Sequence, residues 1–589
     1  MNLKGKILYI RIVSIILCLV ITAGCALGYF SQGKHRQCEN EKFNDYLSDF
    51  FMENVSSNTL NLHYVLKNPK EYGIDSGNCN IADYPIDYDM ASDSLKAGLS
   101  QLDSFRYSSL NTVSKMNYDI LKYHYDSNLK LLGYRYFEEP LSPSNGIHAQ
   151  FPILLCEYKF HSMDAIADYL KILKLVDNYF NGIAFYENQK SKAGLFMSEE
   201  NCQKVIGECR NFIKNPKENI LISTFNKRVN EANFLTDTKR NELCRENEKI
   251  VSSSVIKSYR NLIKTLSKLK NTGHNDYGLF YHRNGKEYYE ELIHSYTGCD
   301  DSADDLFKRI AANRSLNLQK CDKLSDTVTL SKINSEIENS FISDSSAESM
   351  IKSLRKSIES HFPKDNFTNC KISYVDECLK DSLAPAFYIT APVDAYKDNT
   401  IYINDAKEYP PEDYFTTLAH EGYPGHLYQT AMSYEFGNMP FRALLNFPGY
   451  TEGWATYTEM MSFSFCNLNE ETASYLENNK AATLSLYATL DIGIHYYGWQ
   501  IEECKKFLSE YGISDIKITE DIFNLIVQTP GNYLKYYVGY LEFLRIRNDC
   551  EKKYGAGFDE VKFHKTLLKI GPAPFYVIDK YFDYFYNKA

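Results

Sequence analysis

The stretch from Thr416 to Gln429, TTLAHEGYPGHLYQ, interrupts a helical pattern with a proline and two glycines. His420 and Glu421 stand just before this break and His426 directly after it. On a continuous helix, residues six positions apart point in different directions. Pro424 lacks an N–H group and clashes with the preceding turn, so it predicts a break just past Glu421. The break would bring His426 back beside His420.

Two imidazoles beside a carboxylate are the groups that a hydrolytic zinc site uses. Neutral ring nitrogens hold the ion, and the carboxylate acts as a base toward a water. The familiar H-E-x-x-H pattern has its second histidine at i+4, whereas here it is at i+6. A chain with 13 histidines contains about one His-Glu pair by chance, so this pair alone is weak evidence. We predict that His420 and His426 bind one zinc ion, with Glu421 as the general base.

A second motif, TEGWATYTEMM from Thr451, supplies a candidate third ligand. Glu452 lies 26 residues after His426, which allows one turn and a second helix packed against the first. Glu459, seven residues further on, shares a helix face with Glu452 and is either a supporting residue or a rival ligand. The alternative for both glutamates is a solvated helix face.

Several separate motifs together resemble the bacterial family of the domain of unknown function 885. The resemblance covers the chain from about Phe43 to the C-terminus. It implies a distant branch of the gluzincin-type zinc peptidases: a large, mainly α-helical fold with a small β element beside the active-site helices. It implies no particular substrate. The motifs are HEGYPGHLYQ, TEGWATYTE, AFYITAPVDAYKDNTIYIN from Ala386, PLSPSNGIHAQFPILLCEY from Pro140 and TPGNYLKYYVGYLEFLR from Thr529.

The N-terminus has the pattern of a targeting segment. Basic residues at positions 4, 6 and 11 precede an uncharged run from Ile12 to Phe30, which is long enough to span a bilayer and is also typical of a signal sequence. Ala23-Gly24-Cys25 resembles the end of a lipoprotein signal, although Thr22 departs from the usual aliphatic residue. We predict a signal sequence or membrane anchor over 1–30 and an exported, membrane-tethered protein.

Residues 31–589 are predicted to form one catalytic unit in two halves. Residues 39–383 have a helical pattern, and residues 384–589 carry the zinc motifs. Within the second half, the β-branched and aromatic runs between Ala386 and Asn404 predict a hairpin. The resemblance implies that its edge strand binds extended peptide.

Fifteen cysteines say little about mechanism, since no C-x-x-C pair occurs. Cys202 with Cys209 and Cys370 with Cys378 are close enough in sequence for optional disulfides. The net charge, 65 minus 76 or −11, with no long basic run, argues against a nucleic-acid partner.

Two further residues are predicted to stabilise the oxyanion of a tetrahedral intermediate. His495 follows Asp491 by four residues, so the carboxylate could orient the imidazole. Tyr536 lies where the family resemblance places a tyrosine ahead of Gly539. Both could instead be core residues. Arg545 fits a surface ion pair better than a clamp on a substrate carboxylate.

The sequence therefore favours a membrane-tethered zinc metallopeptidase with a peptide substrate. Two alternatives stay open: a catalytically silent peptide-binding lipoprotein, and a zinc hydrolase of a non-peptide amide. The sequence does not decide the oligomeric state.

Overall fold

The computed structural model describes residues 38–588 apart from 75–78, 82–83, 144, 344, 376–379, 381–383 and 406–408. The predicted targeting segment, with Cys25, lies outside the described residues. In the described part, no helix is both long enough and apolar enough to cross a membrane. The molecule is mainly helical with one small sheet, as predicted.

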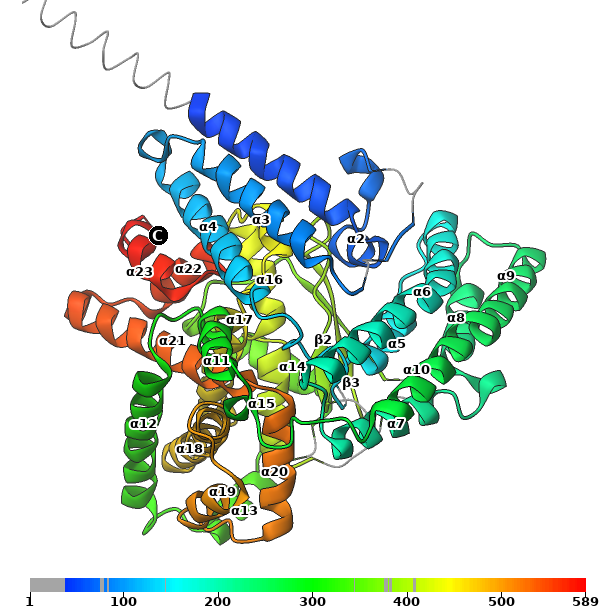
Figure 1. The fold of residues 1–589 in the computed structure, drawn as a ribbon. Coiled ribbons are helices and arrows are strands. Elements are labelled where there is room, and N and C mark those ends of the chain that lie inside the picture. The colour runs from blue at the N-terminus through cyan, green and yellow to red at the C-terminus, as the bar shows by residue number, and fades with distance from the viewer. Residues whose placement is uncertain are drawn as a thin grey trace, which may run out of the picture.

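The first described helices form a layer along the top of the molecule in Figure 1. An unlabelled helix spans 38–56, and Phe43 and Leu47 on one of its faces are fully buried. The side-chain oxygens of Asp87 and Asn111 accept backbone N–H bonds in the first turns of α3 and α4. The labelled helices of this layer are α2 (Thr59–Val65), α3 (Tyr88–Asp103) and α4 (Thr112–Leu132).

Six helices form a lobe at the right of Figure 1 with a hydrophobic core of its own. The longest of them, α6 (Met163–Ala193), begins where the sequence predicts, because the side-chain oxygen of Ser162 accepts the N–H of Ala165 as a helix cap. Cys202 and Cys209 are both buried in this lobe and are not bonded to each other; Cys378 lies outside the described residues. The helices are α5 (Ile147–Glu157), α6 (Met163–Ala193), α7 (Glu199–Phe212), α8 (Ile220–Glu231), α9 (Asp237–Ile250) and α10 (Ile256–Leu269).

The remaining helices surround the centre of the molecule, where α15, α16 and α17 lie (Figure 1). One hydrophobic core extends from Phe43 to Tyr586 and so joins residues of both predicted halves. Its helices include α11 (Gly285–Thr297), α12 (Ala303–Leu324), α14 (Ala347–Ser357), α15 (Pro411–Glu421), α16 (His426–Glu435), α17 (Pro448–Ser462), α18 (Glu470–His495), α21 (Asn532–Tyr554), α22 (Glu560–Ile570) and α23 (Phe575–Tyr586). Beside them lie α13 (Leu330–Glu338), α19 (Ile501–Ser509) and α20 (Ile516–Gln528).

The sheet has the strand order β1–β3–β2. The predicted hairpin is present: β2 (Ala386–Tyr388) pairs antiparallel with β3 (Asp398–Ile403), with Phe387 opposite Tyr402. The strand β1 (Asn369–Tyr374) pairs parallel with β3, inside the region predicted to be helical. That part of the prediction was wrong, because a single strand on an existing hairpin lacks a turn signal of its own. The strand β2 is left at an edge of the sheet.

Candidate metal centre

The break between α15 and α16 sets the positions of His420 and His426. The helix α15 ends at Glu421 and α16 begins at His426, so the break predicted from Pro424 is present. The N–H of Gly425 donates to the carbonyl of Ala419 at 2.9 Å, which folds the connection back onto the first helix. A Cβ atom on Gly425 would lie 1.8 Å from the carbonyl oxygen of His420, so only glycine allows this close approach.

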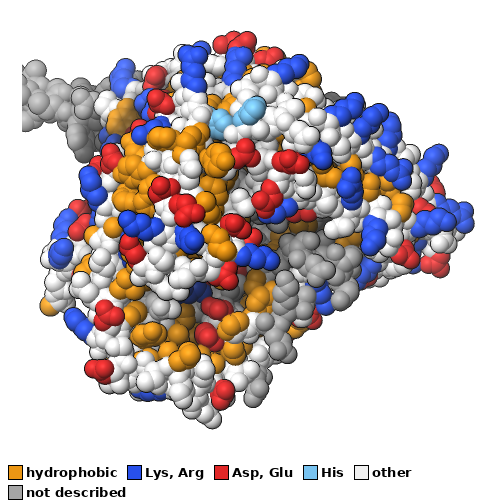
Figure 2. All heavy atoms as spheres, turned by 60° about the horizontal axis from the view of Figure 1, so that its bottom comes forward, with side chains coloured by type: hydrophobic (Ala, Val, Ile, Leu, Met, Phe, Trp, Pro, Cys, Tyr) orange, Lys and Arg blue, Asp and Glu red, His pale blue; other side chains and the backbone are white. Residues whose placement is uncertain are grey.

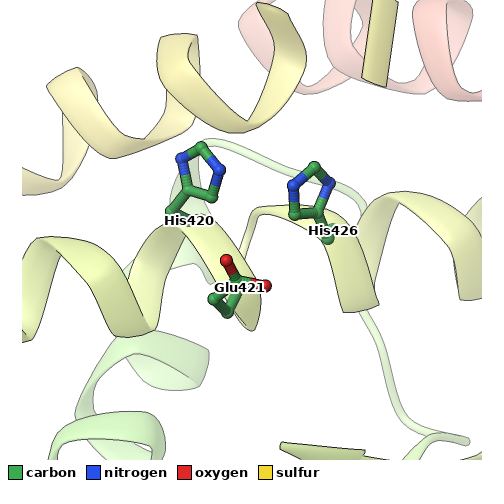
Figure 3. A group of neighbouring side chains, drawn as sticks. All are labelled: His420, Glu421 and His426. Carbon is green, nitrogen blue, oxygen red and sulfur yellow. The ribbon is translucent and has the colours of Figure 1, made fainter. Parts of the chain in front are cut away.

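Both imidazoles project to the same side of the two helices, and Glu421 lies at the end of α15 below them (Figure 3). The ring centroids of His420 and His426 are 4.8 Å apart. Glu452 reaches the same place from α17. Its Oε2 atom lies 3.7 Å from Nε2 of His420 and 3.4 Å from Nε2 of His426.

The two distances from Glu452 are close to those expected between ligands of one zinc ion. Ligand atoms about 2.0–2.1 Å from a tetrahedral zinc lie about 3.3–3.4 Å from one another. Two imidazole nitrogens and one carboxylate oxygen are also the donor set of open catalytic sites. Donor atoms of His420, Glu421 and His426 lie within 4.8 Å of one another, so the predicted base is beside the predicted ligands.

Glu421 is held by the edge strand of the sheet. Its Oε2 atom accepts the backbone N–H of Tyr388 at 2.9 Å. The N–H of Tyr388 therefore points away from β3 and toward the metal centre. Burial raises the pKa of Glu421 above its usual value, and the neighbouring histidines act against this rise. A carboxylate with a raised pKa is better matched to proton transfer near neutral pH.

Glu459 lies on the opposite side of the His420 ring from Glu452. The Nδ1–H group of His420 donates to Glu459 at 2.9 Å, which leaves Nε2 facing Glu452. Lys480, from α18, holds the other carboxylate oxygen of Glu459 at 2.7 Å. A carboxylate that fixes the tautomer and orientation of a metal-binding histidine is a common supporting group. This geometry favours the supporting role for Glu459 over that of a rival ligand.

Glu452 and Glu459 stay ionised despite their burial. Burial alone would raise the pKa of Glu459, but Lys480 and His420 lower it to about 2. Burial likewise opposes the charge on Glu452, yet hydrogen bonds from the two histidines hold its pKa well below the usual value. Burial opposes the charge on His420, but Glu452 and Glu459 raise its pKa to about 10, so the site attracts a positive charge that a bound metal ion can supply in place of the proton.

Tyr536 is brought to the metal centre by a close helix crossing. A Cβ atom on Gly453 of α17 would lie 2.5 Å from the Cα atom of Gly539 of α21, so these helices meet at glycines. The Tyr536 ring centroid then lies 6.3 Å from that of His420. Burial, and then Glu452 and Glu421, raise the pKa of Tyr536, so its hydroxyl stays protonated and can donate.

His495 does not belong to this group, which corrects the prediction. The N–H of Leu279 donates to its Nδ1 atom at 3.1 Å, and its Nε2–H donates to the carbonyl of Ile526 at 2.9 Å. Both nitrogens are therefore engaged in a fully buried position, and burial lowers the pKa to about 4. Asp491 bonds the hydroxyl of Tyr289 and the N–H of Gly531. The i, i+4 spacing of Asp491 and His495 places both on a face of α18 that packs in the core.

Arg545 forms ion pairs with Glu542 and Asp579, as the sequence favours.

Two contributors to the site were not predicted. Tyr388 acts through its backbone N–H, which has no residue-type signal. Lys480 is an ordinary lysine in sequence, and only the packing of α18 brings it to Glu459.

Fold and site together define a mainly helical protein with a candidate His-His-Glu metal centre. The family model described as "Bacterial protein of unknown function (DUF885)" matches residues 81–581, so the chain belongs to this family. No curated protein matches the chain.

Several solved structures match this chain, and two of them illustrate the shared fold. A candidate lipoprotein from Colwellia psychrerythraea is 16% identical, with a TM-score of 0.78, and the match covers 93% of this chain and 100% of that one. A candidate lipoprotein of unknown function from Shewanella oneidensis is 18% identical, with a TM-score of 0.62 and coverage of 91% and 98%. At these identities the likeness shows the fold alone.

Proposed function

We propose that this protein is a zinc-dependent metallopeptidase with a gluzincin-like plan. The observation that carries the proposal is the spacing of the Nε2 atoms of His420 and His426 and the Oε2 atom of Glu452, with Glu421 beside them. These three residues would hold one zinc ion. When bound, zinc supplies a Lewis acid and lowers the pKa of a water from ~9 toward ~7.

Glu421 has the position of a general base. The Tyr388 N–H fixes one of its oxygens, so the other is free to accept a proton from the attacking water. Glu421 then returns this proton to the leaving amine. Tyr536, protonated and next to His420, donates to the oxyanion of the tetrahedral intermediate.

The edge strand β2 supports a peptide as the substrate. Since the Tyr388 N–H reaches Glu421, the free edge of the strand faces the catalytic groups. A substrate in extended conformation can pair with such an edge, which aligns its backbone with the metal centre. Acidic and basic side chains are interspersed over most of the face drawn in Figure 2. The absence of a nucleic-acid partner stays a prediction.

A peptide-library digest tests this proposal. The intact protein, purified in detergent, is incubated with the library with and without a zinc chelator. We expect cleavage that the chelator abolishes and added zinc restores. Zinc binding without peptide cleavage would favour the hydrolase of a non-peptide amide. A protein that neither binds zinc nor cleaves peptides would favour the silent peptide-binding alternative.

We also propose that residues 1–30 hold the protein at the outer side of the cytoplasmic membrane. The two structural neighbours described as candidate lipoproteins support this location. The protein should fractionate with membranes, and a form lacking residues 1–30 should not. If a lipid precursor labels the wild type but not Cys25→Ser, the anchor is a lipid. Recovery of the intact, unprocessed chain in the soluble fraction would contradict the tether.

A further inference from the structure

A cavity of about 530 Å³ is lined by residues that neighbour those of the metal centre along the chain. Two of its lining residues are next to site residues in the chain, since Thr451 precedes Glu452 and Ile389 follows Tyr388, and a third, Thr430, lies one helical turn after His426. Residues four apart share a helix face, so this cavity begins on the face of α16 that carries His426. A substrate bound at the metal centre has this space beside it.

Arg442 is the one charged side chain among the described residues that line this cavity. It belongs to the short helix Pro440–Leu444 and is only 6% exposed. Its guanidinium donates to the side-chain oxygen of Asn117 at 3.3 Å and to the carbonyls of Ile570 and Pro572. All three acceptors are neutral, and among the described residues no Asp or Glu pairs with Arg442. Its Nε atom has no hydrogen-bond partner in the described part of the chain.

A buried cation without an anion is costly, because neutral dipoles replace only part of its hydration. Burial accordingly lowers the pKa of Arg442 to about 10. An anion in the cavity would remove this cost. Ser433 lines the same cavity, and its buried hydroxyl also lacks a hydrogen-bond partner among the residues that the structure describes. The other walls include Leu60, Leu154 and Phe447, which suit an apolar side chain.

We propose that this cavity binds a carboxylate of the substrate, with Arg442 as its counter-charge. The inference rests on the proposed peptidase function and adds a substrate class to it. A carboxylate on a peptide has two sources, the free C-terminus and an acidic side chain. A free C-terminus near the metal centre would make the enzyme a carboxypeptidase.

The test uses three peptides that share one neutral, apolar sequence. The first has a free C-terminus, the second a C-terminal amide, and the third is an amide whose last residue is glutamate. We expect kcat/KM at least about tenfold higher for one carboxylate peptide than for the neutral amide, since a hydrogen bond to a charged group contributes about 1.5–3 kcal/mol. Which carboxylate peptide is favoured identifies the source.

Arg442→Met should abolish this preference, and Arg442→Lys should retain part of it. If Arg442 only ties the carbonyls of Ile570 and Pro572 together, both variants would slow all three peptides equally. The matched control is Arg314→Met. Arg314 is also 6% exposed and donates to neutral groups, the hydroxyls of Tyr511 and Thr489, but it does not line this cavity. The control should keep the preference.

Direct binding of the same peptides to Glu421→Gln separates this inference from the proposed function. If the wild type cleaves none of the three peptides, but Glu421→Gln binds the carboxylate peptides more tightly than the neutral amide and this difference requires Arg442, the inference stands and the peptidase proposal fails. If the wild type cleaves and binds all three peptides equally well, the inference is overturned and the peptidase proposal stands. The wild-type comparison decides this even if Arg442→Met does not fold.

Discussion

Glu421→Gln is expected to lower turnover by ~10²–10⁴-fold, the usual contribution of a general base. Glutamine has nearly the same size and still accepts the Tyr388 N–H through its side-chain oxygen, so fold and zinc content should persist. It cannot accept the proton of the attacking water. Since Glu421 acts mainly in the transition state, kcat should fall much more than substrate affinity. Steady-state kinetics on a cleaved peptide, with metal analysis of the same sample, measures both.

Glu459→Gln is a suitable comparison, because Glu459 lies behind His420 and not beside the substrate. Removing a group that supports a metal ligand typically weakens metal binding ~10–100-fold, so added zinc should rescue this variant. Zinc should not rescue Glu421→Gln. Near wild-type turnover in Glu421→Gln would show that another residue is the general base. Loss of its zinc would make Glu421 a ligand.

Replacing His420, His426 or Glu452 with alanine should each remove most of the bound zinc. A site with three protein ligands and an open position has none to spare. The three side chains come from three different helices and each is only partly buried, so the fold should survive each change. Zinc per protein, measured on dialysed samples with circular dichroism as the folding control, checks the prediction. Full zinc retention in His426→Ala alongside loss in His420→Ala would show that the break does not bring the two histidines to one ion.

The sequence predicted the site best where a local signal and a long-range motif agree. Pro424 predicted the break, and the 26-residue spacing to Glu452 predicted the second helix that reaches the same point. The hairpin of β2 and β3 was predicted from β-branched runs with a turn between them. In each case, residue type and spacing constrain the backbone directly.

The failures come from features that spacing leaves undetermined. Asp491 and His495 have the spacing of an oriented pair, but spacing does not say which face of α18 turns toward the core. Lys480 and Tyr388 depend on tertiary packing or on a backbone group. Arg442 in sequence is one of many basic residues, and only the structure shows that it is buried with no acidic partner from the described ranges.

Metal analysis of the purified wild-type protein tests the central claim most directly. The protein is prepared without added metal, dialysed against metal-free buffer and measured by inductively coupled plasma mass spectrometry. The His420, His426 and Glu452 donor set predicts one zinc per chain, lost on treatment with a strong chelator and regained from one equivalent of zinc. A wild-type protein that is folded, contains no zinc and binds none when titrated would contradict the zinc site and the peptidase proposal with it.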